Sequence, residues 1–216
     1  MNRLDKELIL EYKSRKKKIK DRLAEFRSIT QTADRKELFS ELCFCIMTAN
    51  ANAMHCDTAL KELKAKELIT EGPSSALRPH LRGRVRFHNK KADYIVAARR
   101  LLCDDPKLNL NLNLNLKDVV ATRDWLVENV KGLGFKEASH FLRNIGLGRN
   151  IAILDRHILK NLKKHGVIKT IPDSVGSRKV YIDIEDKMRE FSRRIGIPMD
   201  ELDLLFWSIQ TGFIFK

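Results

Sequence analysis

The stretch KGLGFKEASHFLRNIG, residues 131–146, predicts two helices joined by a glycine turn. Gly132 and Gly134 flank a single leucine, and glycine allows both a tight turn and a close backbone approach. The helix-like run after them begins near Phe135, so its first unpaired N–H groups face the turn. Such a helix N-terminus can bind a DNA phosphate without a side-chain charge. Because plain helical hairpins share the Gly-x-Gly pattern, the turn alone does not establish DNA binding.

Two ionisable residues near the hairpin are candidates for chemistry. Lys136 falls in the first turn of the predicted helix, where stability alone would not select a positive charge. It is either an exposed surface lysine or a nucleophile. Asp155, in the string LDRH, is a preferred N-cap residue for the run that follows it. Its carboxylate could also stabilise positive charge that develops on a nearby sugar, so both alternatives stay open for each residue.

The charge balance of the chain points to a polyanionic partner. Lys and Arg number 42 against 28 Asp and Glu, which gives a formal net charge of +14. Nucleic acid is therefore the first class of partner and an anionic membrane surface the second. No apolar run is long enough to span a membrane, and the first residues do not resemble a signal peptide. We expect a cytoplasmic protein without a membrane partner.

The four cysteines, Cys43, Cys45, Cys56 and Cys103, suit a reducing compartment in which thiols stay free. Cys43 and Cys45 are two residues apart in an apolar helical run, so their thiols point in different directions. No CxxC motif or closely spaced histidine pair supplies convergent metal ligands. We therefore expect core cysteines and no metal site.

Helical patterns cover almost the whole chain and predict an all-α fold. The repeat LNLNLNLNL, residues 108–116, alternates with the period of a strand. Since asparagine is poor in strands and no second strand is predicted, we expect a loop insertion there. Helices are predicted for residues 4–29, 35–49, 52–68, 91–102, 118–130, 135–144, 155–165, 177–195 and 198–210.

The hairpin together with AILDRHIL, residues 152–159, resembles the helix-hairpin-helix plus Gly/Pro…Asp motif of the DNA glycosylase superfamily. Lys136 stands where bifunctional members carry the catalytic lysine, and Asp155 where members carry the aspartate. Further segments are similar to the type-2 8-oxoguanine DNA glycosylases of archaea and some thermophilic bacteria. These segments are ELCFCIMTAN, KKADYIVAARR, RHILKNLKKHG and ELDLLFWSIQTGFIFK. The resemblance covers most of the chain, with gaps at residues 52–83 and in the repeat.

The resemblance implies an all-α fold of two helical lobes with a DNA-binding cleft between them. One lobe would comprise residues 30–148 and the other residues 1–29 with 149–216. It also implies a bifunctional enzyme that excises 8-oxoguanine and nicks the strand by β-elimination, with no cofactor. Lys136 would form a Schiff base with the deoxyribose while Asp155 stabilises the developing charge. The implied partner is double-stranded DNA with 8-oxoguanine or an abasic site, bound by a monomer at the nucleoid.

Four further residues take roles from the resemblance alone. Asn50 would fill the gap left by the extruded base, and its structural alternative is a helix C-cap. Phe87 and Trp207 would flank that base, although Trp207 could also be a core residue. Lys216 would reach into the base pocket, unless the C-terminal tail only packs. The run at residues 51–57 departs from the family pattern, so no contacts are implied for it.

Two other functions remain open from the residues. The first is a glycosylase of the same superfamily for another damaged base, such as an oxidised pyrimidine or an alkylated purine. Monofunctional alkylbase enzymes need only the aspartate, so the lysine argues against them. The second is a non-catalytic helix-hairpin-helix DNA-binding module. It explains the charge and the glycine turn but gives no reason for Lys136 and Asp155 together.

Overall fold

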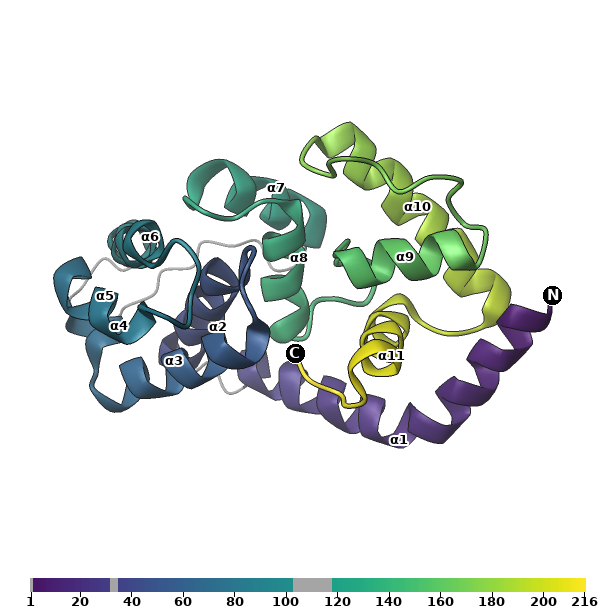
Figure 1. Cartoon of the computed structure of the whole chain (residues 1–216), viewed down its shortest axis with the longest axis horizontal. Coiled ribbons are helices and arrows are strands. Elements are labelled where there is room, and N and C mark those ends of the chain that lie inside the picture. The colour runs from purple at the N-terminus through teal and green to yellow at the C-terminus, as the bar shows by residue number, and fades with distance from the viewer. Residues whose placement is uncertain (1, 32–34, 103–117) are drawn as a thin grey trace. The chain divides into compact units, whose positions relative to one another are not determined.

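The computed structural model of the chain describes residues 2–31, 35–102 and 118–216 (Figure 1). Every regular element in these ranges is a helix, which confirms the all-α prediction, and each predicted helix is present. The loop expected at residues 108–116 lies outside the described residues. The helices are α1 (Arg3–Gln31), α2 (Arg35–Thr48), α3 (Ala53–Ala65), α4 (Leu68–Glu71), α5 (Ser74–Leu81), α6 (His88–Leu102), α7 (Val119–Asn129), α8 (Phe135–Asn144), α9 (Arg156–Lys164), α10 (Arg178–Ile195) and α11 (Met199–Thr211).

Two of these helices, α4 and α5, were not predicted. The first has only four residues, too few for a periodic pattern to emerge. The second contains Pro79, and a proline inside a candidate helix argues against one because it lacks the N–H donor. Among the described residues, no helix is both long and apolar enough to cross a membrane.

The chain forms two units, which are described separately. Unit 1 comprises residues 1–28 and 142–216, and unit 2 comprises residues 29–141. The lobes predicted from the sequence, and the cleft between them, stay a prediction.

The core of unit 2 surrounds α2. All residues of this helix from Leu38 to Thr48 are buried, which explains why its sequence is apolar on most sides. The thiols of Cys43 and Cys45 in α2 and of Cys56 in α3 are free and buried, as predicted for core cysteines. Cys103 lies outside the described residues.

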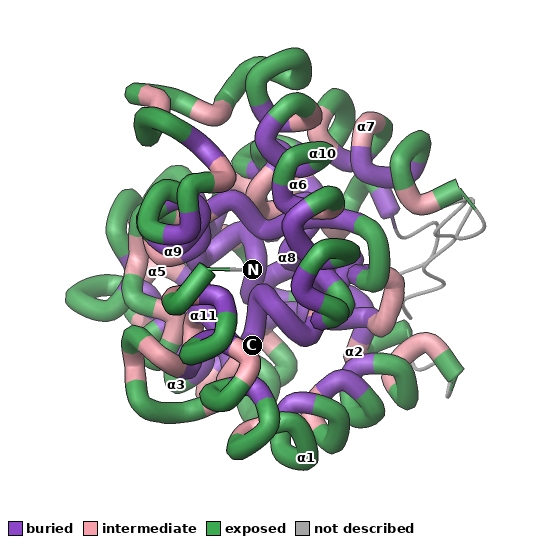
Figure 2. The backbone as a smooth tube through the Cα atoms, turned by 90° about the vertical axis from the view of Figure 1, so that its right-hand side faces the viewer, coloured by how far each residue is buried: buried purple, intermediate pink, exposed green. Residues whose placement is uncertain are grey.

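In unit 1, α1 buries one face and exposes the other, as its tube in Figure 2 shows. Leu8, Ile19 and Phe26 lie on the buried face, whereas the lysines at positions 16–18 are exposed. A fully buried aromatic or aliphatic side chain contributes about 1.5–3 kcal/mol, so this face holds α1 in place. The lysine run is therefore a solvated helix face.

Candidate active site

The glycine turn between α7 and α8 belongs to unit 2. Gly132 has a φ of +89°, a conformation that side chains strongly disfavour. A Cβ atom on Gly132 would lie 2.5 Å from Cδ2 of Tyr94, a residue of α6. Gly134 has no positive φ, and a Cβ there would approach only Oε2 of Glu137, at 3.3 Å. Local geometry therefore requires glycine at position 132 but not at position 134.

Lys136 is the second residue of α8, as the sequence predicted. Its side chain is 23% exposed, so the amine is neither buried nor free on the surface. Nζ lies 3.5 Å from Oε1 of Glu137. An amine that is accessible and has one nearby carboxylate can reach a substrate that binds beside the turn.

Glu137 is a residue of this site that the sequence analysis missed. Its Oε2 accepts a hydrogen bond from the N–H of Gly134 at 3.3 Å, while Oε1 faces Lys136. Gly134 precedes the helix and has no side chain, so the carboxylate at the third helical position supplies the N-terminal cap. A glutamate three residues after the N-cap position is a recognisable signal for this role. The N–H groups of Gly132 and Lys136 donate no hydrogen bond within the described residues, which leaves them available to an anion.

Asn50 and Phe87 are two further residues of unit 2 in left-handed backbone conformations, with φ of 54° and 58°. Asn50 lies two residues after Thr48, the last residue of α2, in a left-handed conformation that asparagine tolerates. Its side chain is exposed and donates or accepts no hydrogen bond in the described part of the chain. Phe87 is 54% exposed, and the guanidinium of Arg86 lies 4.9 Å from the centre of its ring. Both side chains thus face solvent from strained turns.

A buried lysine that the sequence analysis also missed links these turns. Nζ of Lys91 donates to the carbonyl oxygens of Met47 and Ala49, at 2.7 and 2.5 Å. Burial lowers the pKa of Lys91, and the positive charges of Lys136 and Arg86 lower it further. The site residues that unit 2 contributes are therefore close enough to influence one another electrostatically.

Asp155 belongs to unit 1 and caps α9. Its Oδ1 accepts a hydrogen bond from the N–H of Ile158 at 2.8 Å, which confirms the N-cap interpretation. Within the described residues the second carboxylate oxygen, Oδ2, accepts no hydrogen bond. The carboxylate is half-buried, so one oxygen is fixed by the helix and the other is available.

Two buried side chains of α10 hold the segment that leads to Asp155. The hydroxyl of Tyr181 donates to the carbonyl oxygen of Ala152 at 2.6 Å and accepts from the N–H of Leu154 at 3.2 Å. The N–H of Ala152 donates to Oε2 of Glu185 at 2.7 Å. Because hydrogen bonds with a buried tyrosine and a buried glutamate are costly to break, they fix the backbone before Asp155.

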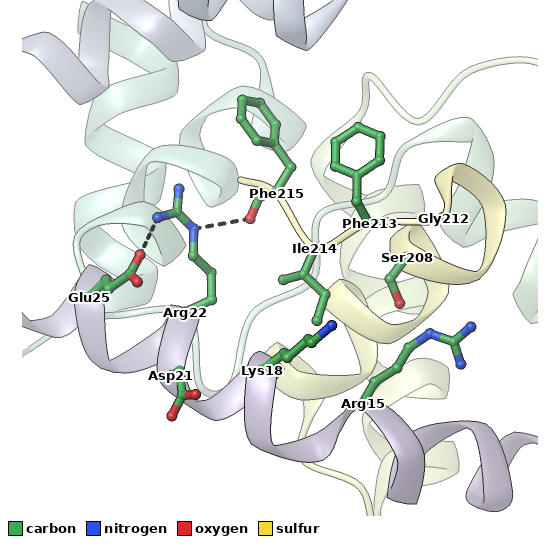
Figure 3. Close-up of a pocket in the computed structure, with 10 residues that line it drawn as sticks. All are labelled: Arg15, Lys18, Asp21, Arg22, Glu25, Ser208, Gly212, Phe213, Ile214 and Phe215. Atoms are coloured by element: carbon green, nitrogen blue, oxygen red, sulfur yellow. Dashed lines mark hydrogen bonds and ion pairs between the residues drawn. The ribbon is translucent and has the colours of Figure 1, made fainter.

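The C-terminal tail folds back onto Trp207 in unit 1. The ring of Trp207 is edge-on to Phe213, with centroids 5.1 Å apart, and stacked with Phe215 at 6.0 Å. Arg22 of α1 donates from Nε to the carbonyl oxygen of Phe215 at 3.3 Å (Figure 3). Trp207 is half-buried, so it is not the core residue that the alternative required. The residue before Lys216 is thus attached both to α11 and to α1.

A pocket of about 580 Å³ lies between the tail and α1. Figure 3 shows the tail residues above a basic stretch of α1. The lining residues are Arg15, Lys18, Asp21, Arg22, Glu25, Ser208, Gly212, Phe213, Ile214 and Phe215. Arg15 and Arg22 are paired with Glu11 and Glu25, so much of the charge in this pocket is already neutralised. In the described ranges, no group of three or more His, Cys, Asp or Glu side chains could hold a metal ion.

Residues 19–197 match the sequence model of a protein family described as 8-oxoguanine DNA glycosylase. The chain belongs to this family. An 8-oxoguanine DNA glycosylase/AP lyase of Fusobacterium nucleatum is 43% identical over 206 residues, which cover 95% of this chain and 94% of the relative. The resemblance inferred from the hairpin and its flanking segments is therefore confirmed.

Solved structures of family members have the same fold. The 8-oxoguanine DNA glycosylase of Thermotoga maritima superposes with a TM-score of 0.87 at 36% identity, covering 99% of this chain and 98% of that one. The 8-oxoguanine glycosylase/lyase of Methanocaldococcus jannaschii, in complex with a 15mer DNA containing 8-oxoguanine, gives a TM-score of 0.86 at 36% identity. That match covers 99% of each chain. The helix-hairpin-helix architecture predicted from the sequence is that of this family.

Proposed function

We propose that this glycosylase excises 8-oxoguanine with Lys136 as nucleophile and Asp155 as the stabilising carboxylate. Full-length relatives named 8-oxoguanine DNA glycosylase/AP lyase carry both activities in their name, so the chain is a glycosylase and an AP lyase. The accessible amine in the first turn of α8, directly after the Gly132 turn, is the observation that supports the assignment. The alternative of a non-catalytic DNA-binding module does not fit a family of enzymes.

The reaction begins with extrusion of the damaged base, because C1′ of its sugar cannot be reached inside the stack. The amine of Lys136, after losing a proton, attacks C1′ of the deoxyribose. The bond from C1′ to the base breaks, and the electron pair leaves with 8-oxoguanine, which takes up a proton. Opening of the sugar ring gives a Schiff base between Lys136 and C1′. Loss of a proton from C2′ then expels the 3′ phosphate oxygen and nicks the strand.

Asp155 stabilises the positive charge that develops on the sugar as the base departs. The hydrogen bond from the N–H of Ile158 to its capped oxygen orients the carboxylate. Its uncapped oxygen is free to face the sugar. The hydrogen bonds of the preceding backbone with Tyr181 and Glu185 keep it rigid, and electrostatic catalysis requires a charged group to be held in place.

The remaining predicted site residues bind DNA or the extruded base. Asn50 fills the gap in the duplex, and the glycine turn at Gly132 and Gly134, with the unbonded N–H groups of Gly132 and Lys136, binds a backbone phosphate. Phe87 and Trp207 stack on the base, and Lys216 hydrogen-bonds its edge. The exposure of Phe87 and the docked tail support these assignments. The substrate is double-stranded DNA with 8-oxoguanine or an abasic site, and the enzyme acts as a monomer in the cytoplasm at the nucleoid.

Borohydride trapping tests the nucleophile directly. Duplexes with 8-oxoguanine, an abasic site or thymine glycol are incubated with enzyme and borohydride, and covalent adducts are resolved on a denaturing gel. We expect adducts with the first two duplexes, and none when Lys136→Gln replaces the wild type. Lys131→Gln, an exposed lysine of the same hairpin, is the matched control and should trap normally. A normal adduct with Lys136→Gln would reject the assignment, and efficient adducts with thymine glycol alone would reassign the substrate.

A further inference from the structure

Lys91 is the one lysine among the described residues whose side chain is buried, with 4% of the residue exposed. Its ammonium lies at the C-terminal end of α2, where carbonyl groups have no partner inside the helix. It donates to the carbonyl oxygens of Met47 and Ala49, and the thiol of Cys56 also donates to that of Met47, at 3.3 Å. Side chains of α6 and α3 thus hold the last turn of α2 together.

The turn held in this way carries Asn50. Its φ of 54° makes it a left-handed residue at a helix C-terminus, a position that asparagine tolerates. Its own side chain is exposed and has no hydrogen bond in the described part of the chain. The backbone therefore fixes the direction of its Cα–Cβ bond, and Lys91 holds the carbonyl of the preceding residue, Ala49.

The backbone of Lys91 is bonded to a second unusual turn. Its N–H donates to the carbonyl oxygen of Phe87 at 3.1 Å. Phe87 also has a positive φ, and such a conformation persists in a bulky residue only where the surrounding structure enforces it. Lys91 therefore bonds to both turns: its side chain to the carbonyl of Ala49, next to Asn50, and its main-chain N–H to the carbonyl of Phe87.

Stability alone is a poor reason for a lysine here. An ammonium in a buried position is costly unless it is fully paired. Burial lowers the pKa of Lys91, and although Cys56 and Glu137 raise it, Lys136 and Arg86 lower it again. The hydrogen bond to Met47 is buried and the one to Ala49 is part-buried, so water could replace the ammonium only at Ala49. A charged side chain that is kept in spite of these costs indicates a demand for a fixed geometry.

We propose that Lys91 is a positioning residue of the DNA-binding surface. Its ammonium holds the turn that carries Asn50 in a fixed position relative to Phe87 and the start of α6. The two turns are then in place before DNA binds, so that extrusion of the base needs no ordering of the loops. This inference rests on the roles proposed above for Asn50 and Phe87. Lys91 acts through these residues and touches no reacting atom.

Substitution Lys91→Met tests the proposal, because methionine keeps the length of the side chain and removes the donor. The matched control is Arg99→Met, on the same helix. The guanidinium of Arg99 donates to the carbonyl oxygens of Ile69 and Gly72, at 2.9 and 2.8 Å, and so it also holds a helix end. If Lys91→Met does not fold, Lys91→Leu, which also lacks a donor, replaces it with the same expectations.

Three quantities are measured for each variant: the unfolding midpoint, single-turnover excision of 8-oxoguanine, and borohydride trapping on a duplex with an abasic site. An abasic site has no base to extrude, so trapping reports Lys136 chemistry with little dependence on base extrusion. We expect Lys91→Met to slow excision by about tenfold or more, since small misplacements of contacting groups carry such penalties. Trapping should change much less. Arg99→Met should lose comparable stability and keep both activities.

A double substitution with Asn50→Ala completes the test. If Lys91 acts through Asn50, the double variant should excise no more slowly than the slower single variant. The inference would be overturned if the two substitutions multiplied their effects on the excision rate. It would also be overturned if the Lys91 variant excised at the wild-type rate, or if Arg99→Met lost as much excision activity as the Lys91 variant. If Asn50→Ala excises normally, the role of Asn50 is rejected and the inference with it. Failure of the wild type to excise 8-oxoguanine would instead reject the proposed function.

Discussion

Replacing Gly132 by alanine should destabilise the protein far more than the same change at Gly134. The φ of +89° at Gly132 costs a non-glycine residue about 1–2 kcal/mol. The added Cβ would also lie 2.5 Å from Cδ2 of Tyr94, and relieving such overpacking costs about 1–3 kcal/mol. We therefore expect Gly132→Ala to lose about 2–5 kcal/mol of unfolding free energy.

Gly134→Ala is the internal control for this prediction. Its φ suits any residue, and its Cβ would meet only the flexible carboxylate of Glu137, at 3.3 Å. The change in unfolding free energy should stay within about 0.5 kcal/mol. If a DNA phosphate approaches this turn, the methyl group should nevertheless weaken DNA binding. Gly134→Ala thus separates the contact with DNA from the stability of the turn.

Urea unfolding followed by circular dichroism measures both free energies, provided that the slope with denaturant is unchanged. Fluorescence anisotropy with a labelled duplex measures binding. A loss below about 0.5 kcal/mol for Gly132→Ala would refute the argument from backbone conformation and the Tyr94 contact. Unchanged DNA affinity for Gly134→Ala would refute the phosphate contact while leaving the fold argument intact.

Three further predictions concern single residues of unit 1. Asp155→Asn should slow base excision by at least ~10²-fold, and stability should change little because asparagine also caps helices. Excision at the wild-type rate would mean that Asp155 serves only as a helix cap. Removing Lys216 should reduce excision of 8-oxoguanine by at least ~10-fold while abasic-site nicking continues, and equal loss of both would contradict a role in base recognition. Burial lowers the pKa of His165 below 6.5 in the folded protein. Just below that pH the unfolded state therefore binds more protons than the folded state, and stability should fall as the pH drops below about 6.5. Thermal unfolding of wild type and His165→Gln between pH 7.5 and 5.5 measures this, and an identical pH dependence would exclude His165 as the cause.

Features that depend on nearby residues could be predicted from the sequence. The hairpin, the first-turn position of Lys136 and the capping role of Asp155 all follow from residues within a few positions of one another. The buried cysteines followed from an apolar run in α2. Local periodicity and capping rules act over one or two helical turns, so the correct predictions are those that depend on residues within that distance of one another.

Features that depend on contacts between distant segments could not be predicted. Lys91 looked like one of many basic residues, because nothing in its neighbourhood identifies the carbonyls of Met47 and Ala49 as its partners. The two glycines of the turn looked equivalent, and only the contact of Gly132 with Tyr94 distinguishes them. The role of Phe87 likewise depends on backbone angles that residue types leave open, whereas the spacing of Glu137 from Gly134 could have indicated its capping role.

The docking of the tail against Trp207 also gives the enzyme a spectroscopic probe. The chain has two tryptophans, and Trp125→Phe would leave Trp207 as the single indole emitter. Stacked on Phe215 and edge-on to Phe213, its emission should report whether the tail is docked. A purine that stacks on the indole would quench this emission. Stopped-flow mixing with unlabelled duplex could then time the arrival of the extruded base separately from the cleavage chemistry.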